Sequence, residues 1–527
     1  MKSVSFISLL LGSVLTILCA AHPGFSQTAG TLDVSFHSTG TLVTDNGYLD
    51  LYQDVEVQPD GKIVAAGTFY DAIWSASIQV VRLLENGSND PSFGDNGVFT
   101  YHKNYETGAY ACHIKENGKI LVAGITTDDL GAFAMIVLQM DPDGVLDPSF
   151  GTSGVSYIDL GPGEDIAYAM TVQQDNKILL AGYSANANYL NVPVVVRLNP
   201  DGSLDNSFGI NGVATVPVTE TDNDFSCLDL QSDGKIVAAG HISNGLNWFS
   251  LLAARFDTSG VLDATYANEG ILNLNLNNVD DEFFGMKIQE DDRAVLTGFT
   301  TMSNTLDFHF LAMRLTNEGL ADPTFGTDGV VVMDQNPYMV GNAMVIQPDG
   351  KILIAGTSGE KMPMNNDWCL WRLNQDGTPD LSFGNQGNVL TEFFGEADEA
   401  RALALTGDRI VVAGKARNVS QNFDFAIARY INDIGVSIPG YAANPGLEIY
   451  PNPIYVTKTL HLRKPDNSPV TQVNMSFFDG KIVPVRYSDG EKEWMNLELP
   501  ADLAPGVYLL QVSSETANYS CKIVVLN

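Results

Sequence analysis

The chain has 527 residues, of which 45% are hydrophobic, and 63 acidic side chains against 28 basic ones give a net charge of −35. The hydrophobic content excludes a disordered protein, and the length exceeds that of one ordinary compact domain. So acidic a chain would repel a phosphate backbone, which excludes nucleic acid as a partner and suits a soluble exported protein.

The first segment, residues 1–26, is predicted to be a secretory signal peptide. Lys2 is the only charged residue before Asp33, and an apolar run to Ala21 is followed by "HPG" and small residues. These features are typical of a signal peptide, with cleavage after Ala21 or after Ser26. A single membrane anchor is the alternative, because the run approaches the shortest length that spans a bilayer.

A ten-residue motif then returns seven times. It begins as "QPDGKIVAAG" at Gln58, and the basic residue after its turn recurs every 57 or 58 residues. These basic residues are Lys62, Lys119, Lys177, Lys235, Arg293, Lys351 and Arg409. So regular a period predicts a repeat architecture.

Each unit is expected to contain four short strands. The first two flank the Asp-Gly turn, which we expect to be a two-residue hairpin of the primed type with positive φ at its central residues. Where Gly is absent from the second central position, only Asn176, Asp292 or Asp408 replaces it, and these side chains tolerate the left-handed region. The third strand ends in Arg, except at Gln139, and a "LDPSFG" segment leads to the fourth strand.

The aspartate of "LDPSFG" is present in all seven copies. These aspartates are Asp33, Asp90, Asp147, Asp205, Asp263, Asp322 and Asp380. Catalysis needs one asymmetric constellation, whereas a short carboxylate at a turn commonly accepts local backbone N–H groups. We therefore interpret these aspartates as structural, with the following aromatic ring packed between neighbouring units.

Seven units of four strands predict an all-β fold, a seven-bladed β-propeller over residues 27–434. Only neighbouring blades can cover the two apolar faces of each blade, so a closed ring is expected to bury more apolar surface than an open stack. The first "LDVSF" and the strand 41–44 lack a complete unit before them, and the last unit lacks both features. We predict that strand 41–44 completes the last blade.

The remaining connections open on the opposite end of the blades and differ in every unit. Binding residues commonly lie on variable loops of a rigid scaffold. The candidate ligand-binding residues on these loops are Trp74, Asp128, Asp129, Tyr189, Trp248, Asp280, Asp281 and Trp368. Aromatic rings beside amide and carboxylate groups suit a glycan or a protein ligand, although each Trp has an alternative role in capping a blade core.

No catalytic residue, metal ligand or cofactor is predicted. The histidines show no H-E-x-x-H spacing, no G-x-S-x-G is present, and no calcium loop stands out. The cysteines Cys112, Cys227, Cys369 and Cys521 are far apart, so we expect buried thiols rather than bridges or a metal site. Carboxylates from different blades meeting in the central funnel remain an alternative for a polysaccharide-degrading enzyme.

The periodicity stops after Tyr430. Residues 435–446 are rich in small side chains and are predicted to be a linker. Residues 447–527 contain short alternating strands typical of a compact Ig-like β-sandwich.

Two resemblances follow from these motifs. The tail resembles the type A C-terminal sorting domain of Bacteroidota type IX secretion; the match is carried by Tyr450, Pro451, Asn452, Pro453, Gly506, Tyr508 and Lys522. The repeats of residues 31–430 resemble delta-60 repeats, a propeller-like family of mostly unknown activity. The resemblance implies export through the inner membrane, recognition of the tail by the type IX machinery, and release or attachment at the cell surface.

The resulting hypothesis is a secreted or cell-surface, monomeric propeller that binds an extracellular glycan or protein through its variable face. Two alternatives are a polysaccharide hydrolase or lyase with carboxylates in the funnel, and a purely structural surface protein.

Overall fold

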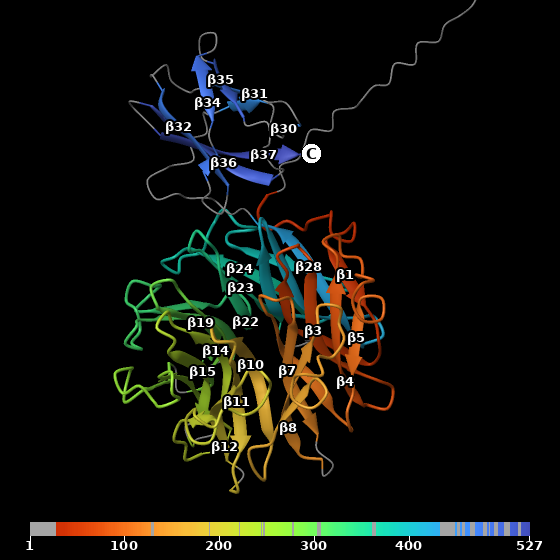
Figure 1. Cartoon of the computed structure of the whole chain (residues 1–527). Coiled ribbons are helices and arrows are strands. Elements are labelled where there is room, and N and C mark those ends of the chain that lie inside the picture. Colours follow the sequence, from red (N-terminus) through yellow and green to blue (C-terminus); the bar gives the residue numbers. More distant parts are fainter. Residues whose placement is uncertain are drawn as a thin grey trace, which may run out of the picture. The chain divides into compact units, whose positions relative to one another are not determined.

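The computed structural model describes most of the repeat array and the strands of the C-terminal segment (Figure 1). The described residues are 28–127, 131–188, 190–220, 222–243, 245, 248–276, 279–302, 307–360, 365–432, 448–450, 454–455, 459–463, 470–477, 482–483, 485–489, 494–499, 506–514 and 518–526. The predicted signal peptide and linker lie outside these residues.

The chain divides into two compact units, one of residues 1–347 and 351–433 and one of residues 348–350 and 434–527. Every regular element of the described residues is a β-strand. None of their elements is a helix long and apolar enough to cross a membrane.

The described residues of the array contain 28 strands, which form seven antiparallel groups of four. The last group is joined to the first by a single parallel pair, Leu49 with Phe423, and the fifth to the sixth by Phe308 with Tyr338, so these groups form two eight-stranded sheets. The first group comprises β2 (Leu49–Val57), β3 (Ile63–Tyr70), β4 (Ala76–Leu83) and β5 (Val98–Tyr101), and the second comprises β6 (Thr107–Ile114), β7 (Ile120–Thr127), β8 (Phe133–Met140) and β9 (Val155–Ile158). The third comprises β10 (Asp165–Val172), β11 (Ile178–Ala185), β12 (Asn191–Leu198) and β13 (Val213–Thr215), and the fourth comprises β14 (Asp224–Leu230), β15 (Ile236–Ser243), β16 (Phe249–Phe256) and β17 (Ile271–Leu274). The fifth group comprises β18 (Asp281–Ile288), β19 (Ala294–Thr301), β20 (Phe308–Leu315) and β21 (Val330–Met333), and the sixth comprises β22 (Tyr338–Ile346), β23 (Ile352–Glu360), β24 (Asn365–Leu373) and β25 (Asn388–Thr391). The seventh comprises β26 (Asp398–Thr406), β27 (Arg409–Arg417), β28 (Phe423–Ile431) and β1 (Thr41–Thr44).

The last group takes its fourth strand from the other end of the array. β1 pairs antiparallel with β28, with Thr41 opposite Ala428 and Thr44 opposite Phe425, and Figure 1 shows the two strands side by side. The first strands lie beside one another in the order β2, β6, β10, β14, β18, β22 and β26, and β26 in turn lies beside β2. The order of neighbours is therefore cyclic.

The apolar cores lie between neighbouring groups. One cluster joins Ile63 and Val81 of the first group to Val411 and Ile427 of the last, and six similar clusters join the other neighbours within the described residues. Each "LDPSFG" ring is buried at such a boundary, as Phe208 is. A Cβ on Gly260 of the next group would lie only 2.8 Å from that ring, which explains why glycine is required there.

Backbone hydrogen bonds follow the same cycle. Among the described residues, each group donates one N–H to a turn carbonyl of the next group, and the last group donates to the first. These bonds run from Gly94 to Asp143, Gly151 to Asp201, Gly209 to Ser259, Ala267 to Glu318, Gly326 to Asp376, Gly384 to Ala29 and His37 to Asn86, at 2.6–3.2 Å.

The recurrent Asp-Gly hairpin differs from the two-residue turn predicted from the sequence. In the first group, Gln58 N donates to Lys62 O (2.8 Å) and Gly61 N donates to Gln58 O (2.9 Å), which defines a three-residue loop. A primed turn would need positive φ at both Asp60 and Gly61, but only Gly61 has it. Instead a type I turn is followed by Gly61 at φ 83°, the pattern of a G1 bulge. The same three-residue loop forms after Lys115 and Gln231, where no proline is present.

The expected tolerance of this position for Asn and Asp is confirmed in two groups. Asn176 and Asp292 both have φ of 64°, in the left-handed region. The last group is an exception, because Thr406 pairs with Arg409 across only two residues and the positive φ (53°) is at Gly407 instead. The prediction of positive φ at Asp408 was therefore wrong.

The glycine that ends the motif is explained by a β-bulge in every first strand. In the third group the bulge lies between Ala167 and Ala169, which pushes the Ile166 carbonyl toward Gly182. A Cβ on Gly182 would lie 1.8 Å from that oxygen, a distance no side chain can accept. The equivalent distances are 1.9–2.4 Å at Gly67, Gly124, Gly240, Gly298, Gly356 and Gly414.

The C-terminal unit contains two sheets. The first has the order β29 (Glu448–Tyr450), β31 (Thr459–Arg463), β35 (Trp494–Glu498), β34 (Arg486–Asp489), and the second has the order β30 (Ile454–Tyr455), β37 (Asn518–Leu526), β36 (Gly506–Ser514), β32 (Val470–Phe477), β33 (Ile482–Val483). Of the sorting-motif residues, Tyr450 lies in β29, Gly506 and Tyr508 in β36, and Lys522 in β37. Pro451, Asn452 and Pro453 lie outside the described residues.

Candidate functional site

The two regular connections of each group lie at the same end of its strands. Lys119, after the hairpin of the second group, places Nζ 2.7 Å from Oδ2 of Asp147 in the "LDPSFG" segment. The equivalent pair is found in all seven groups, at up to 3.9 Å. The other connections must therefore open at the opposite end, which we call the variable face.

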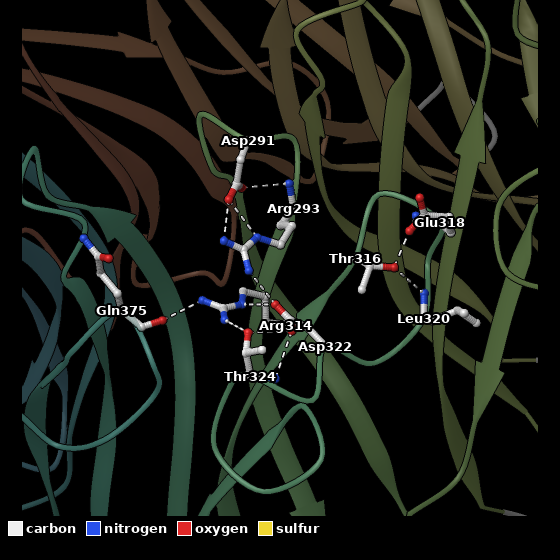
Figure 2. Close-up of polar contacts among 9 residues, drawn as sticks. All are labelled: Asp291, Arg293, Arg314, Thr316, Glu318, Leu320, Asp322, Thr324 and Gln375. Atoms are coloured by element: carbon white, nitrogen blue, oxygen red, sulfur yellow. Dashed lines mark hydrogen bonds and ion pairs between the residues drawn. The ribbon is translucent and has the colours of Figure 1, made fainter.

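The "LDPSFG" aspartate has the structural role predicted from the sequence. Figure 2 shows Asp322 accepting hydrogen bonds from Thr324 N (3.0 Å) and Oγ1 (2.7 Å) through Oδ1, and from Arg314 and Arg293 (both 2.7 Å) through Oδ2. Arg314 also donates to the Gln375 carbonyl of the next group (2.5 Å). Burial opposes ionisation of Asp322, but hydrogen bonds from Thr324 and both arginines outweigh it and lower the pKa.

In the second group Gln139 replaces the arginine, and the network is kept because Lys115 supplies the positive charge. Gln139 Nε2 donates to Asp147 (2.6 Å), and the buried Lys115 donates to Gln139 Oε1 (2.9 Å). In the fourth group the same two positions hold Gln231 and Arg255, which are themselves hydrogen-bonded (3.3 Å). The positive charge has thus moved from the third strand to the residue before the hairpin.

The structure places the predicted ligand-binding residues in different environments. Trp74 is 65% exposed on the β3–β4 connection, whereas Trp248 and Asp280 are half-buried. Asp128, Asp129 and Tyr189 lie outside the described residues.

Two of the predicted ligand-binding residues are buried and do not line a surface. Trp368 is 1% exposed, because its ring packs on Phe393 and its Nε1 donates to the Lys415 carbonyl (3.0 Å). Asp281 is 0% exposed and accepts hydrogen bonds from Thr300 Oγ1 (2.5 Å) and Leu276 N (2.7 Å). These two assignments are corrected to structural roles: Trp368 caps a core, and Asp281 holds the loop before β18.

An exposed aromatic patch surrounds Trp74 on the variable face, and we define it as Tyr48, Ile73, Trp74 and Tyr105. Tyr48 is 47% exposed and its ring lies 6.0 Å from that of Trp74. Tyr105 is 83% exposed, and its carbonyl accepts a hydrogen bond from the N–H of Ala76, two residues after Trp74 (3.3 Å). Sequence reasoning missed Tyr48 and Tyr105, which lie on the connections between units; those connections open on the same face.

The backbone of the patch is held in an unusual conformation. Trp74 has φ of 60°, which a bulky side chain rarely adopts. Asp71 stabilises it, because Oδ1 accepts hydrogen bonds from Ile73 N (2.9 Å) and Ser75 N (3.0 Å) while its carbonyl accepts one from Trp74 N (3.0 Å). Strain of this kind at a solvent-facing aromatic side chain is typical of functional sites.

A second feature joins a histidine to two carboxylates from neighbouring first strands. His241 Nδ1 lies 3.4 Å from Asp224 Oδ1 and 3.8 Å from Glu282 Oε2, and it forms no hydrogen bond within the described part of the chain. The His241 ring packs on Phe249. Burial raises the pKa of Glu282 to about 7, so this carboxyl titrates where a general base is useful.

Two sets of carboxyl groups in the array have opposite pKa shifts. Burial raises the pKa of Asp50, Asp54 and Asp398 to about 7 and that of Asp165 to about 6. Hydrogen bonds lower the pKa of Asp33 and Asp263 to about 2, against the effect of burial.

These shifts predict maximal stability of the array near pH 4–5. The aspartates with lowered pKa stabilise the fold above pH ~4 and lose this effect as pH falls toward 2. The carboxyls with raised pKa favour the folded state when protonated, so stability decreases as pH rises from about 4 to 7. Thermal unfolding midpoints measured from pH 2 to 9 in EDTA test this, and Asp398→Asn should flatten the slope above pH 4. A stability that rises steadily to pH 8 would contradict it.

Three of the four cysteines after the predicted leader, Cys112, Cys227 and Cys369, are buried and unbridged, as expected. The fourth, Cys521, lies in β37. Burial raises the pKa of the thiol of Cys227, so it is unreactive at neutral pH.

Comparison with known proteins agrees with the repeat period. The family described as a domain of unknown function (DUF5122) beta-propeller matches residues 58–93, 115–150, 173–208, 231–266 and 347–383. The fifth and seventh copies, with Asp292 and Asp408 at the turn, lie outside the matched ranges. A secretion system C-terminal sorting domain matches residues 448–526. Comparison with curated proteins found no match.

Several solved structures resemble the chain at low identity. They include PorZ, a surface component of the type-IX secretion system of Porphyromonas gingivalis (10% identity, 92% of this chain, 75% of that chain, TM-score 0.32). The β-propeller domain of the Trilobed protease from Pyrococcus furiosus matches at 11% identity over 73% of this chain and 94% of that chain, with a TM-score of 0.39. The polysaccharide lyase Uly1 matches at 10% identity over 80% of this chain and 95% of that chain, with a TM-score of 0.44.

The predicted repeats and tail are thus confirmed as families: this chain carries DUF5122 β-propeller repeats and a type IX secretion C-terminal sorting domain, which implies a secreted or cell-surface protein.

Proposed function

We propose that residues 27–434 form a closed seven-bladed β-propeller, that strand 41–44 completes its last blade, and that residues 447–527 form an Ig-like sandwich after a linker of residues 435–446. The cyclic order of first strands, the cores between neighbouring groups and the hydrogen bonds that return to Ala29 and Asn86 support this ring. The two sheets of the C-terminal unit support the sandwich.

The propeller serves as a binding module, and its ligand is a glycan or protein held at the variable face. The aromatic patch carries this proposal, because three of its large apolar side chains are each more than half exposed: Ile73, Trp74 and Tyr105. A rigid scaffold seldom leaves so much apolar surface in water without a ligand to cover it. Flat rings suit the apolar face of a sugar or an interface hot spot.

Polar groups beside the patch add directionality. Tyr70, whose ring lies 6.2 Å from that of Trp74, donates a hydrogen bond to Glu106 Oε1 (3.0 Å). Asp71 and Glu106 therefore place carboxylates next to apolar rings, a combination that binds hydroxyl-rich or basic partners. Neutral or amino sugars and basic protein surfaces are the favoured ligand classes, since the acidic chain would repel polyanions.

Binding to the patch is testable with a glycan array and a capture assay for extracellular proteins. Trp74→Ala and Tyr105→Ala should each weaken binding at least about tenfold, the effect of losing ~1.4 kcal/mol of contact at a hot spot. Ile210→Ala is the matched control, because Ile210 is 81% exposed at the opposite end of the groups and should bind like the wild type. Equal loss with Ile210→Ala, or no effect of Trp74→Ala, would contradict the proposal.

A polysaccharide-degrading enzyme is the second candidate, and the proximity of His241, Asp224 and Glu282 favours it. A carboxylate with pKa about 7 beside a histidine suits a general acid or base in hydrolysis or elimination. Release of sugar products from a polysaccharide panel, abolished in Glu282→Gln, would select this alternative. No binding and no product release would leave the third hypothesis, a purely structural surface protein.

The C-terminal unit directs the chain to the type IX secretion machinery, its implied partner. Release from the cell and attachment to its surface are both compatible with this route. The array and its tail thus have separate tasks, and the ligand-binding variants leave the sorting domain unchanged.

A further inference from the structure

Three carboxylates meet where the two ends of the array join. Asp45 lies on the connection between β1 and β2, Asp50 lies in β2, and Asp424 lies in β28. One oxygen from each lies within 4.8 Å of the others. Asp45 is exposed, whereas Asp50 and Asp424 are buried.

The buried carboxylate of Asp50 lacks a partner for one of its oxygens. Oδ2 accepts a hydrogen bond from Asn46 N (2.6 Å), but Oδ1 has no hydrogen-bond partner within the described residues although Asp50 is 0% exposed. In the seventh group, the equivalent Asp398 bonds through both oxygens, to Phe393 N (3.0 Å) and Arg417 N (3.1 Å). A buried carboxylate oxygen left without a donor is destabilising unless another group contacts it.

No basic side chain compensates the three charges. Within the part of the chain that the structure describes, none of Asp45, Asp50 and Asp424 forms an ion pair with Lys, Arg or His. Burial, with a smaller contribution from the neighbouring charges of Asp45 and Asp424, raises the pKa of Asp50 to about 7. Three like charges at this separation need a cation or a proton to be stable near neutral pH.

We propose that Asp45, Asp50 and Asp424 bind a divalent cation of the calcium class. Carboxylate oxygens are the ligands of such ions, and calcium accepts irregular sets of six to eight oxygens in which waters take part. The exposed side of Asp45 leaves room for these waters, and the Asp50 Oδ1 atom gains the contact that the protein does not provide.

The position of this site gives the ion a structural effect. Asp424 belongs to the last group, Asp50 to the first, and Asp45 to the segment that connects β1 with β2. An ion bound by all three would therefore tie both ends of the array together. A ligand that binds only the folded chain raises its stability in proportion to the logarithm of ligand concentration.

The full mature chain tests the proposal by thermal unfolding in EDTA and in increasing calcium at pH 7.5. Calcium at about 100 times its dissociation constant should raise the midpoint by roughly 2 °C or more. Terbium offers a second readout, because the nearby Tyr48 can sensitise its luminescence. Asp45→Asn should reduce the calcium shift by at least half; because Asp45 is exposed, this variant tests the site without disturbing the core.

Asp165→Asn is the matched control for Asp50→Asn. Asp165 is equally buried at the equivalent position and accepts a hydrogen bond from Leu160 N through Oδ2 (2.7 Å), while its Oδ1, like that of Asp50, has no hydrogen-bond partner within the described residues. Unlike Asp50, it belongs to no group of three metal-ligand side chains among these residues, so the comparison isolates the effect of the cluster. Calcium should still stabilise Asp165→Asn but not Asp50→Asn or Asp424→Asn. The proposal would be overturned if calcium did not raise the unfolding midpoint of the wild type. It would also be overturned if calcium raised the midpoints of Asp50→Asn and Asp165→Asn equally.

Discussion

Deletion of residues 31–44 is expected to destabilise the array by on the order of 5–10 kcal/mol, enough to unfold an ordinary domain. These residues include β1 and the buried Phe36, which is 0% exposed. Loss of a buried Phe side chain alone costs about 3–5 kcal/mol. The deletion also removes Asp33 and leaves the buried guanidinium of Arg429 without its carboxylate.

The physical reason is that these residues contact both the last group and the first group. Asp33 N donates to Arg429 O (2.8 Å), Asp33 Oδ2 lies 2.6 Å from Arg409, and His37 N donates to Asn86 O of the first group (2.9 Å). Without them, β28 becomes an exposed edge and the core against the first group is opened to water. The effect should therefore exceed that of deleting a strand of equal length from the exposed rim.

Thermal and urea unfolding of the mature chain measure the effect. Because the deletion variant can fail to fold, Phe36→Ala provides a graded version, expected to cost about 3–5 kcal/mol. Phe208→Ala, at the equivalent position of the third group, is the control. It should cost about the same if the N-terminal segment with Phe36 and β1 contributes to the ring as much as the corresponding segment of the third group does. A deletion variant with the wild-type midpoint would exclude the proposed closure.

Breaking one buried Arg–Asp pair is expected to cost about 3–5 kcal/mol. Asp322→Asn leaves Arg314, whose side chain is 4% exposed, without its charged partner (Figure 2). The loss exceeds that of a surface pair because the remaining charge stays buried while water cannot reach it. Arg314→Met should cost a similar amount, since it leaves the Asp322 carboxylate less fully paired.

The same close-up offers the matched control. Asp291, half exposed, pairs with Arg293 at the edge of this network, and Asp291→Asn should change stability by no more than about 1 kcal/mol. The double variant Arg314→Met with Asp322→Leu should recover much of the loss of either single change, because no buried charge is left unpaired. Equal, small effects of Asp322→Asn and Asp291→Asn in urea unfolding would show that the pair contributes little.

The fold was largely predictable because its information is local and repeated. The "PDG" turns, the alternating strands and the "LDPSFG" segments each report a short-range preference, and seven copies made the period unambiguous. The hairpin type was mispredicted because the loop contains three residues rather than two: Gln58 N bonds Lys62 O, and only Gly61 has positive φ. The recurrent glycine at the end of the motif was recognised, but its cause, the bulge in the neighbouring strand, involves a second segment.

The candidate site was predicted only in part. Trp74 was found because its loop is variable and aromatic, but the same reasoning also selected Trp368, which packs against Phe393. Composition does not reveal whether an aromatic side chain of a loop ends in water or in a core, since that depends on the neighbouring group. Tyr48 and Tyr105 become part of one surface only when successive connections are brought to the same face.

The sequence by itself determined the repeat, the sorting tail and the role of the recurrent "LDPSFG" aspartate, because these depend on neighbours within a few positions along the chain. Only the tertiary structure decided which side chains from distant groups meet, such as Asp45 and Asp50 with Asp424, or His241 with Glu282. The physical reason is that carboxylates and rings interact over a few ångströms in space, and closing the chain on itself sets those distances independently of separation in sequence.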